Sequence, residues 1–166
     1  MGMVILPLAI AFLVTSRVAN ALVRRYGIRS LLGGLGLMAM GLLVLLSGFG
    51  TTWAHPIAPS MTRISIALAL HGAGQGLVIV PLIGLILTGV PRTQAGAAAG
   101  LLITAQQLAG ALGVACIGGL YFTFAADGTV TGMTHGTMAG CIAMLVALGA
   151  AATGFMQLGA RQRQLA

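Results

Sequence analysis

Long apolar stretches alternate with short polar connections along the whole chain. Five stretches are long enough to cross a bilayer, because a hydrocarbon core about 30 Å thick requires roughly 20 residues of helix. They cover residues 3–23, 31–49, 64–90, 95–124 and 136–158. The fourth is longer than one crossing needs, so we expect it to be tilted or frayed. The pattern predicts an all-α integral membrane helical bundle with five transmembrane helices.

The connections carry the residues that interrupt helices. They read "RRYGIRS", "GTTWAHPIAPSMTR", "GVPRTQ" and "AADGTVTGMT", and the chain closes with "ARQRQLA". Proline and glycine in these segments are typical of turns. Trp53 and His55 in the second connection fit an interfacial anchor. We treat residues 1–166 as a single membrane domain.

Composition supports lipid as the surroundings of this chain. Hydrophobic residues make up 58% of it and charged residues only 5%, whereas soluble domains carry about 25% charged residues. The mean hydropathy is +1.07. A chain with so few charges cannot cover a globule with a solvated surface.

The net charge of +7 comes from eight arginines and a single acidic residue, Asp127. Nucleic-acid-binding proteins present their basic residues on a polar face, but these arginines lie between apolar runs, so we expect no nucleic-acid partner. One side of the predicted membrane holds only Arg63, and the other holds Arg17, Arg24, Arg25, Arg29, Arg92, Arg161 and Arg163. The positive-inside rule therefore predicts a multi-pass inner-membrane protein with its N-terminus outside and its C-terminus in the cytoplasm.

The sequence offers little to enzyme chemistry. A single carboxylate cannot form a catalytic pair, and Cys116 and Cys141 lie inside apolar runs without metal-ligand spacing. We expect no enzyme, no metal site and no bound cofactor.

Three stretches together resemble a known family. They are "PLAIAFLVTSRVANALVRRYGIRSLLGGLGL", "LHGAGQGLVIVPLIGLILTGVPRTQAGAAAGL" and "AQQLAGALGVACIGG". In this order they resemble the C-terminal part of a major facilitator superfamily transporter, of the fourteen-span drug:proton antiporter type that includes EmrB and QacA. The chain departs from the family pattern at Arg24, where the fullest loop motif has aspartate, and at Ala109, where glycine is usual.

The resemblance implies a function and a set of partners. It implies alternating access, in which a proton gradient drives the efflux of drugs or other small amphiphilic compounds across the lipid bilayer. Five spans make up less than one six-helix half, so a missing N-terminal half would complete the carrier and supply the proton-carrying group. The alternative is a non-transporting membrane subunit or assembly partner that acts only in an oligomer.

The basic turn between the first two spans is one candidate functional feature. The loop motif consists of Arg24, Arg25, Gly27 and Arg29. Glycine permits a tight reversal, and arginine is favoured near phospholipid headgroups and helix C-terminal carbonyls. We interpret the turn as a topology signal; a part in the conformational cycle follows only from the resemblance.

Polar residues inside the spans are candidates for a substrate path. His71 and Gln75 are four residues apart and share one face of the third span. Two readings remain open, a neutral histidine bonded to a neighbouring helix and a histidine that lines the path. In the fourth span Gln107 and Thr104 share a second candidate face. Pro81 is expected to kink the third span.

Pairs of small residues four apart predict close helix contacts, because lipid provides no hydrophobic drive for helix association. The pairs are Gly72 and Gly76, Gly96 and Gly100, Ala109 and Gly113, and Gly136 and Gly140.

Overall fold

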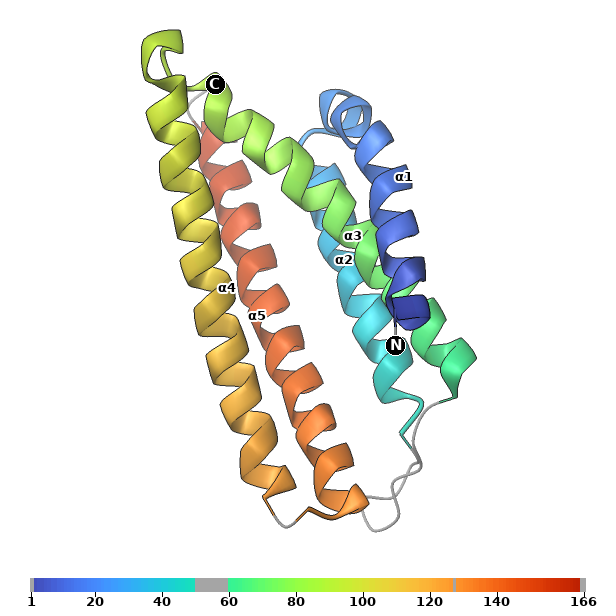
Figure 1. Cartoon of the computed structure of the whole chain (residues 1–166). Helices are drawn as coiled ribbons and strands as arrows, with labels where there is room; N and C mark the ends of the chain where they lie inside the picture. Colours follow the sequence, from blue (N-terminus) through green and yellow to red (C-terminus); the bar gives the residue numbers. More distant parts are fainter. Residues whose placement is uncertain (1, 50–59, 127, 165–166) are drawn as a thin grey trace.

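The computed structural model describes residues 2–49, 60–126 and 128–164. This part of the chain forms five long helices and no strand, as the hydropathy pattern predicts (Figure 1). The helices are α1 (Gly2–Tyr26), α2 (Ile28–Leu46), α3 (Met61–Thr88), α4 (Ala95–Ala125) and α5 (Val130–Gln164), with a short 3₁₀ turn η1 (Arg92–Gln94) before α4. Each is long and apolar enough to cross a membrane. The fold class is therefore an all-α membrane helical bundle.

Local caps explain why two helices begin earlier than the apolar pattern predicts. α3 begins at Met61 because the Ser60 hydroxyl accepts a hydrogen bond from the Arg63 backbone N–H, at 3.4 Å. α5 begins at Val130, six residues before the predicted start at residue 136, because the Thr129 hydroxyl accepts one from the Gly132 N–H, at 3.0 Å. Such N-caps satisfy donors that have no partner within the helix.

α3 lies at the centre of one group of helices, in contact with both α1 and α2. α1 packs against the predicted small-residue pair of α3, Gly72 and Gly76. A Cβ at Gly72 would collide with the backbone of Leu8, and one at Gly76 would lie 2.8 Å from the Phe12 carbonyl oxygen. The prediction of a close contact at these glycines is confirmed.

The contact between α3 and α2 uses glycines that the four-residue pattern does not predict. A Cβ at Gly34 would lie 3.0 Å from the Gly74 carbonyl oxygen, and one at Gly41 would lie 2.9 Å from the His71 backbone nitrogen. Most of the buried apolar side chains belong to these two helices and include Leu31, Leu35, Leu42, Ala67, Leu77 and Val78.

α4 and α5 form a second group, which joins the first mainly through contact between α5 and α2. The predicted pair Gly136 and Gly140 of α5 lies at the contact between α5 and α4, facing Tyr121 and Ile117 of α4. The prediction is wrong for α4 itself within this chain. Among the described residues, no atom outside the backbone of α4 lies within 4 Å of a Cβ at Gly96, Gly100 or Gly113, and Ala109 is exposed.

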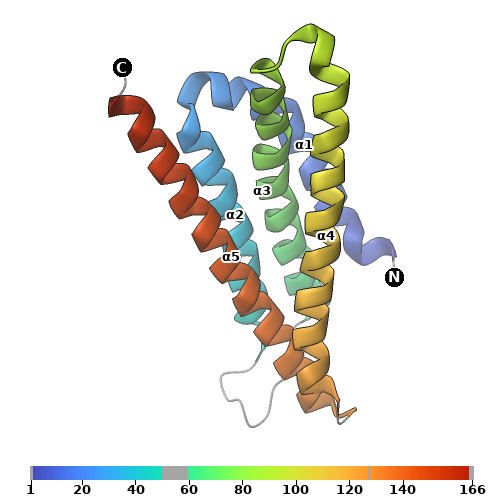
Figure 2. The same cartoon turned by 90° about the vertical axis from the view of Figure 1, so that its left-hand side faces the viewer.

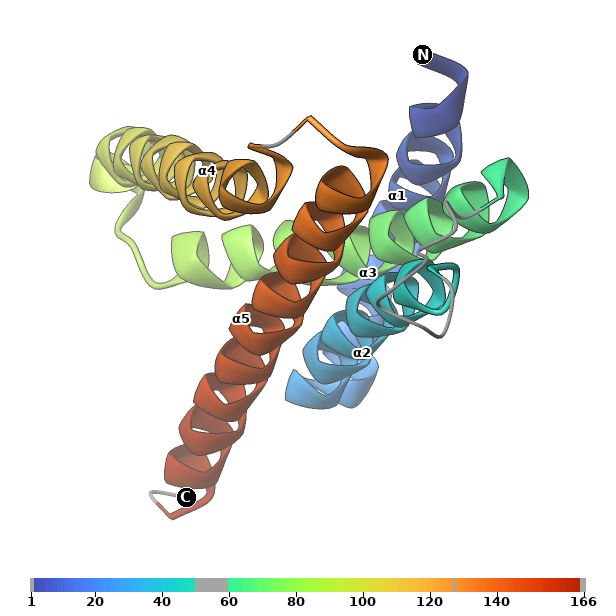
Figure 3. The ribbon, with the colours of Figure 1, turned by 90° about the horizontal axis from the view of Figure 1, so that it is seen from below.

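α4 stands at the edge of the bundle when the molecule is seen from below (Figure 3). None of its residues is buried, although it is as apolar as the other helices. The helix is unbroken from Ala95 to Ala125. It therefore presents an apolar and glycine-lined surface that no other described part of the chain covers.

Connections alternate between the two ends of the bundle. The α1–α2 turn, the α3–α4 connection and the last turns of α5 lie at one end, and the start of α3 and the α4–α5 connection lie at the other (Figure 2). Arg24, Arg25, Arg29 and Arg92 therefore share an end, and Arg63 lies at the opposite one. Trp53, His55 and Asp127 lie outside the described residues.

Candidate transport path and basic turn

The turn between α1 and α2 consists of one residue, Gly27. Its φ of 59° and ψ of −136° are rarely adopted by residues with a side chain. Its N–H donates to the Val23 carbonyl oxygen at 2.8 Å, and its carbonyl oxygen accepts from the Ser30 N–H at 3.1 Å. The chain thus leaves one helix and enters the next without an intervening loop, as the position of this glycine predicts.

The arginines of the turn differ in their electrostatic setting. Arg24 and Arg25 occupy the last turn of α1, where the helix dipole favours cations. The Arg25 guanidinium carbon lies 5.5 Å from the centre of the Tyr26 ring, within the range of a cation–π contact. Arg29 lies in the first turn of α2, where the dipole disfavours a cation, and α2 has no side-chain N-cap. All three side chains are exposed.

Arg63, at the opposite end, is held by a helix terminus. Its Nη1 donates a hydrogen bond to the carbonyl oxygen of Ser47, at 3.0 Å. Ser47 is the C-cap residue of α2, so the cation lies where the dipole of that helix favours positive charge. The contact links the end of α2 to the start of α3 and gives this arginine a structural role.

His71 lies at the interface between α3 and α2. The backbone of His71 lies close to Gly41 of α2, and its ring faces the backbone of Met38 on the same helix. The residue is half-buried. Its Nδ1 atom is buried and has no hydrogen-bond partner among the described residues. Gln75, one turn further along α3, is also half-buried. The first candidate face is therefore directed at least partly toward a neighbouring helix of the same chain.

The second candidate face lies on the open side of the bundle. Gln107 and Thr104 are exposed on α4, and the Thr104 hydroxyl donates to the Gly100 carbonyl oxygen of its own helix, at 2.9 Å. α3 and α4 make only a marginal contact. The structure therefore does not bring the four substrate-path candidates together into one site within this chain.

Pro81 lies inside α3 and is buried. The helix continues from Met61 through this proline to Thr88. The structure thus keeps the helix continuous across the residue expected to kink it, and a functional role for a kink stays a prediction.

Sequence reasoning overlooked two features of α2. Ser30 is buried, with 7% of its surface exposed, and its hydroxyl has no hydrogen-bond partner within the described part of the chain. Gly34 and Gly41 both allow close contact with α3. The glycine contact could have been predicted from the sequence, since the two glycines are seven residues apart and share one face of α2. A single serine in an apolar helix gives no such signal.

The fold defines a class: this is a multi-pass membrane protein with five apolar helices. Comparison with known proteins adds that it is similar to bacterial transporters. It is 33% identical over 104 residues to the probable actinorhodin transporter of Streptomyces coelicolor, which covers 59% of this chain and 16% of that protein. It is 34% identical over 118 residues to the drug efflux pump JefA of Mycobacterium tuberculosis, covering 70% of this chain and 22% of the pump.

A third relative is similar over most of the chain. The uncharacterized transporter YebQ of Escherichia coli is 33% identical over 145 residues, which are 87% of this chain and 30% of that protein. The matched region is thus less than a third of the length of each of these relatives. No family model matches the chain, and no solved structure matches it. The relatives are named as transporters and efflux pumps and not as enzymes, which agrees with the expectation of a non-enzymatic protein.

Proposed function

We propose that this chain forms part of a proton-coupled efflux carrier of the major facilitator superfamily, of the drug:proton antiporter type. The similarity to transporters over 59–87% of the chain, on a fold of five apolar helices, is the observation that carries the proposal. Alternating access would move drugs or other small amphiphilic compounds outward in exchange for protons.

The exposed surface of α4 supports a partner made of further membrane helices. A 31-residue apolar helix with no buried residue is unusual within a bundle, and its open glycines allow another helix to approach closely. We propose that the N-terminal half of the carrier covers this surface. Gln107 and Thr104 would then lie between the two halves, where amides in a membrane helix find polar partners or water.

Proton coupling is assigned to that same partner. No acidic residue occurs between residues 1 and 126, and the only one in the chain is Asp127, which follows α4. The carboxylate that carries the proton would therefore lie in the N-terminal half. His71 and Gln75 remain proposed contributors to the substrate path. In the complete carrier, His71→Leu should change the rate of efflux or its pH dependence; unchanged rates would remove His71 from the path.

Reconstitution tests the proposal directly. The 166-residue chain is placed in vesicles with an acidic interior, alone or together with the N-terminal half of its carrier, and uptake of ethidium is measured. The proposal predicts no proton-dependent movement for the chain alone and movement for the two halves together. Proton-dependent transport by the chain alone would refute the assignment of proton coupling to the N-terminal half.

The second candidate function is a non-transporting subunit that acts in an oligomer. The same uncovered surface of α4 favours it, since a second copy of this chain could also pack there. Crosslinking and sizing in mild detergent separate the two. A defined homo-oligomer supports the subunit, whereas a chain that is monodisperse only with the N-terminal half supports the carrier.

We also propose the orientation in the inner membrane. Arg24, Arg25, Arg29 and Arg92 lie at one end of the bundle and Arg63 at the other, so the arginine-rich end is assigned to the cytoplasm. The N-terminus would then be outside.

A further inference from the structure

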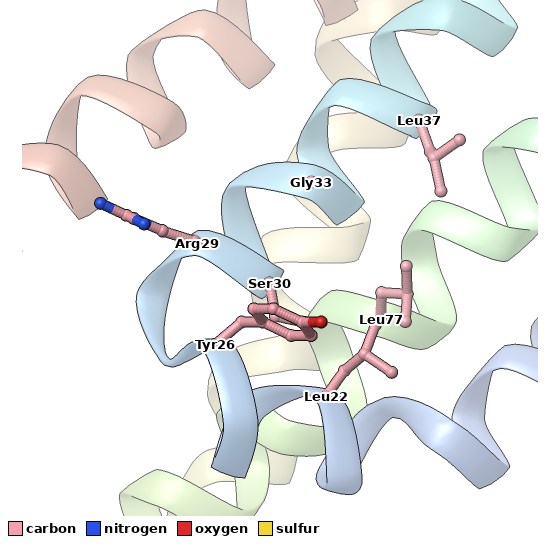
Figure 4. A pocket seen from close by; sticks show the side chains of 7 residues that line it. All are labelled: Leu22, Tyr26, Arg29, Ser30, Gly33, Leu37 and Leu77. Atoms are coloured by element: carbon pink, nitrogen blue, oxygen red, sulfur yellow. The ribbon is translucent and has the colours of Figure 1, made fainter.

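A cavity of about 310 Å³ lies at the arginine-rich end, where α1, α2 and α3 meet. Its polar residues are Tyr26, Arg29 and Ser30, which surround the start of α2 (Figure 4). Tyr26 and Arg29 are exposed, so the cavity opens on the outer surface of these helices. The transport proposal does not use it.

The buried Ser30 hydroxyl lacks a partner beside this cavity. Only 7% of the residue is exposed, and its Oγ makes no hydrogen bond within the described ranges. Burial of a hydroxyl without a partner is unfavourable. A polar atom that enters the cavity from outside would remove this cost, which indicates that the cavity takes a ligand with a hydrogen-bonding group.

The charges around the cavity select an anion. α2 starts at Ile28 without a side-chain N-cap, so its first N–H groups have no side-chain acceptor and carry the positive end of the helix dipole. Arg29 is in that first turn and lines the rim of the cavity, where its side chain points outward, away from Ser30, Leu22 and Leu77 (Figure 4). The helix terminus and the arginine therefore both add positive potential at the rim.

The rest of the cavity is apolar. Leu22, Leu37 and Leu77 line it on three different helices, and Gly33 leaves an open space beside them. An inorganic anion would contact the polar rim and leave this apolar part empty. An amphiphile with an anionic head and a hydrocarbon tail would use both.

We propose that this cavity binds one anionic phospholipid of the cytoplasmic leaflet. Its phosphate lies at the rim, where the exposed side chains of Tyr26 and Arg29 turn so that it accepts hydrogen bonds from Arg29 and from the buried Ser30 hydroxyl. One acyl chain lies against Gly33 and Leu37. The lipid is the occupant that the surroundings supply, because these helices are embedded in a bilayer and basic pockets between membrane helices on the cytoplasmic side suit lipid headgroups. The inference does not depend on transport and is testable without it.

Binding of a fluorescent phosphatidylglycerol to the purified full chain in neutral detergent micelles tests the charge requirement, with fluorescent phosphatidylcholine as the neutral reference. We expect saturable binding of phosphatidylglycerol and at least tenfold weaker binding of phosphatidylcholine. Arg29→Gln should weaken phosphatidylglycerol binding about fivefold, because one arginine near an anionic lipid contributes about 1 kcal/mol, which corresponds to that change in affinity. Arg92→Gln, the matched control, removes the same charge from the same end but lies outside the cavity and should change affinity less than twofold. An equal loss of phosphatidylglycerol affinity in the two variants would show that the lipid is held only by general electrostatic attraction to the basic end of the bundle, and would refute the site.

Two glycines on α2 provide a matched pair for the acyl chain. Gly33 lines the cavity and Gly36 does not, and a Cβ at either position meets no atom within 4 Å. Gly33→Leu should fill the slot and weaken phosphatidylglycerol binding at least fivefold, whereas Gly36→Leu should bind like the parent chain. Binding by Gly33→Leu at parental affinity would contradict the proposal.

Competition separates a lipid from a free phosphate. Glycerol 1-phosphate at millimolar concentration should not displace the fluorescent lipid, because it lacks the acyl chain. Displacement at concentrations similar to those of unlabelled phosphatidylglycerol would show that the cavity recognises a soluble phosphate and would refute the lipid assignment.

Ser30→Ala tests the hydroxyl. It should weaken lipid binding and also raise the resistance of the lipid-free chain to unfolding, since the unpartnered hydroxyl is gone. A variant that binds as tightly as the parent would exclude Ser30 from the site.

Discussion

The close contact of Gly72 with the α1 backbone leads to a quantitative prediction. A methyl group added by Gly72→Ala would collide with the Leu8 carbonyl oxygen and lie 2.9 Å from the Leu8 carbonyl carbon and 3.0 Å from its Cα. All three atoms belong to the backbone, so no side-chain rotation relieves the contact. α1 and α3 must move apart, and the contacts along their interface weaken.

The magnitude follows from two opposing effects. Overpacking of a tight contact costs about 1–3 kcal/mol, and alanine is favoured over glycine in a helix by about 0.5–1 kcal/mol. The difference of these terms is about 0–2.5 kcal/mol, and we expect Gly72→Ala to lower the free energy of unfolding by about 1 kcal/mol or more, because the collision is with backbone atoms. Gly84→Ala is the matched control: it is on the same helix, exposed, with no atom within 4 Å of the new Cβ. It should be neutral or slightly stabilising.

Unfolding by SDS in mixed micelles, followed by near-UV circular dichroism, measures both variants. This signal reports the packing of aromatic side chains, whereas the helices themselves persist in SDS. Gly72→Ala should unfold at a lower SDS fraction than the parent, and Gly84→Ala at the same fraction or higher. If Gly72→Ala proves as stable as Gly84→Ala, the α1–α3 contact does not exist in the form described.

Three further predictions use the same assay or a simple labelling reaction. Gly27→Ala should destabilise the chain by about 1–2 kcal/mol, because its φ of 59° is unfavourable for an L-residue; an unchanged SDS midpoint would contradict the single-residue turn. Arg63→Gln should cost about 0.5–1 kcal/mol through loss of the bond to the Ser47 carbonyl oxygen, and a variant of parental stability would show that this bond contributes nothing. In detergent, maleimide should label Cys116, which is exposed, well before Cys141, which is buried; equal rates would refute the packing of α5.

The fold was predictable because lipid leaves the backbone few options. Every N–H and carbonyl group in the hydrocarbon core needs a partner within the protein, so a long apolar stretch has to form a helix. Length and hydropathy therefore identified all five helices. Their ends were less predictable, since Ser60 and Thr129 add capping interactions that extend helices into segments that are not apolar.

Helix contacts were predictable only in part. A pair of small residues shows where another helix can approach, but not whether one does. Gly72 and Gly76 meet α1, whereas Gly96 and Gly100 meet no other helix in the described part of the chain. The bond between Arg63 and Ser47 joins residues 16 apart in the sequence. Such contacts depend on how two helices meet in space, which one helix alone does not encode.

The candidate site was the least predictable feature for the same reason. His71 and Gln75 share a face by helical periodicity, yet what that face meets is decided by Gly41 and Met38 of α2. Gln107 is exposed, and the partner that we propose for it is not part of this chain. Their role in transport therefore stays a prediction.

The arrangement in the membrane is the central claim, and compartment-specific reporters test it most directly. Alkaline phosphatase is active only outside the cytoplasm, and green fluorescent protein exported unfolded does not fluoresce there. A fusion after Arg29 lies in the first turn of α2, at the arginine-rich end, and one after Thr51 lies in the second connection of the chain. We predict fluorescence after Arg29 and phosphatase activity after Thr51; both positions in one compartment would contradict the account.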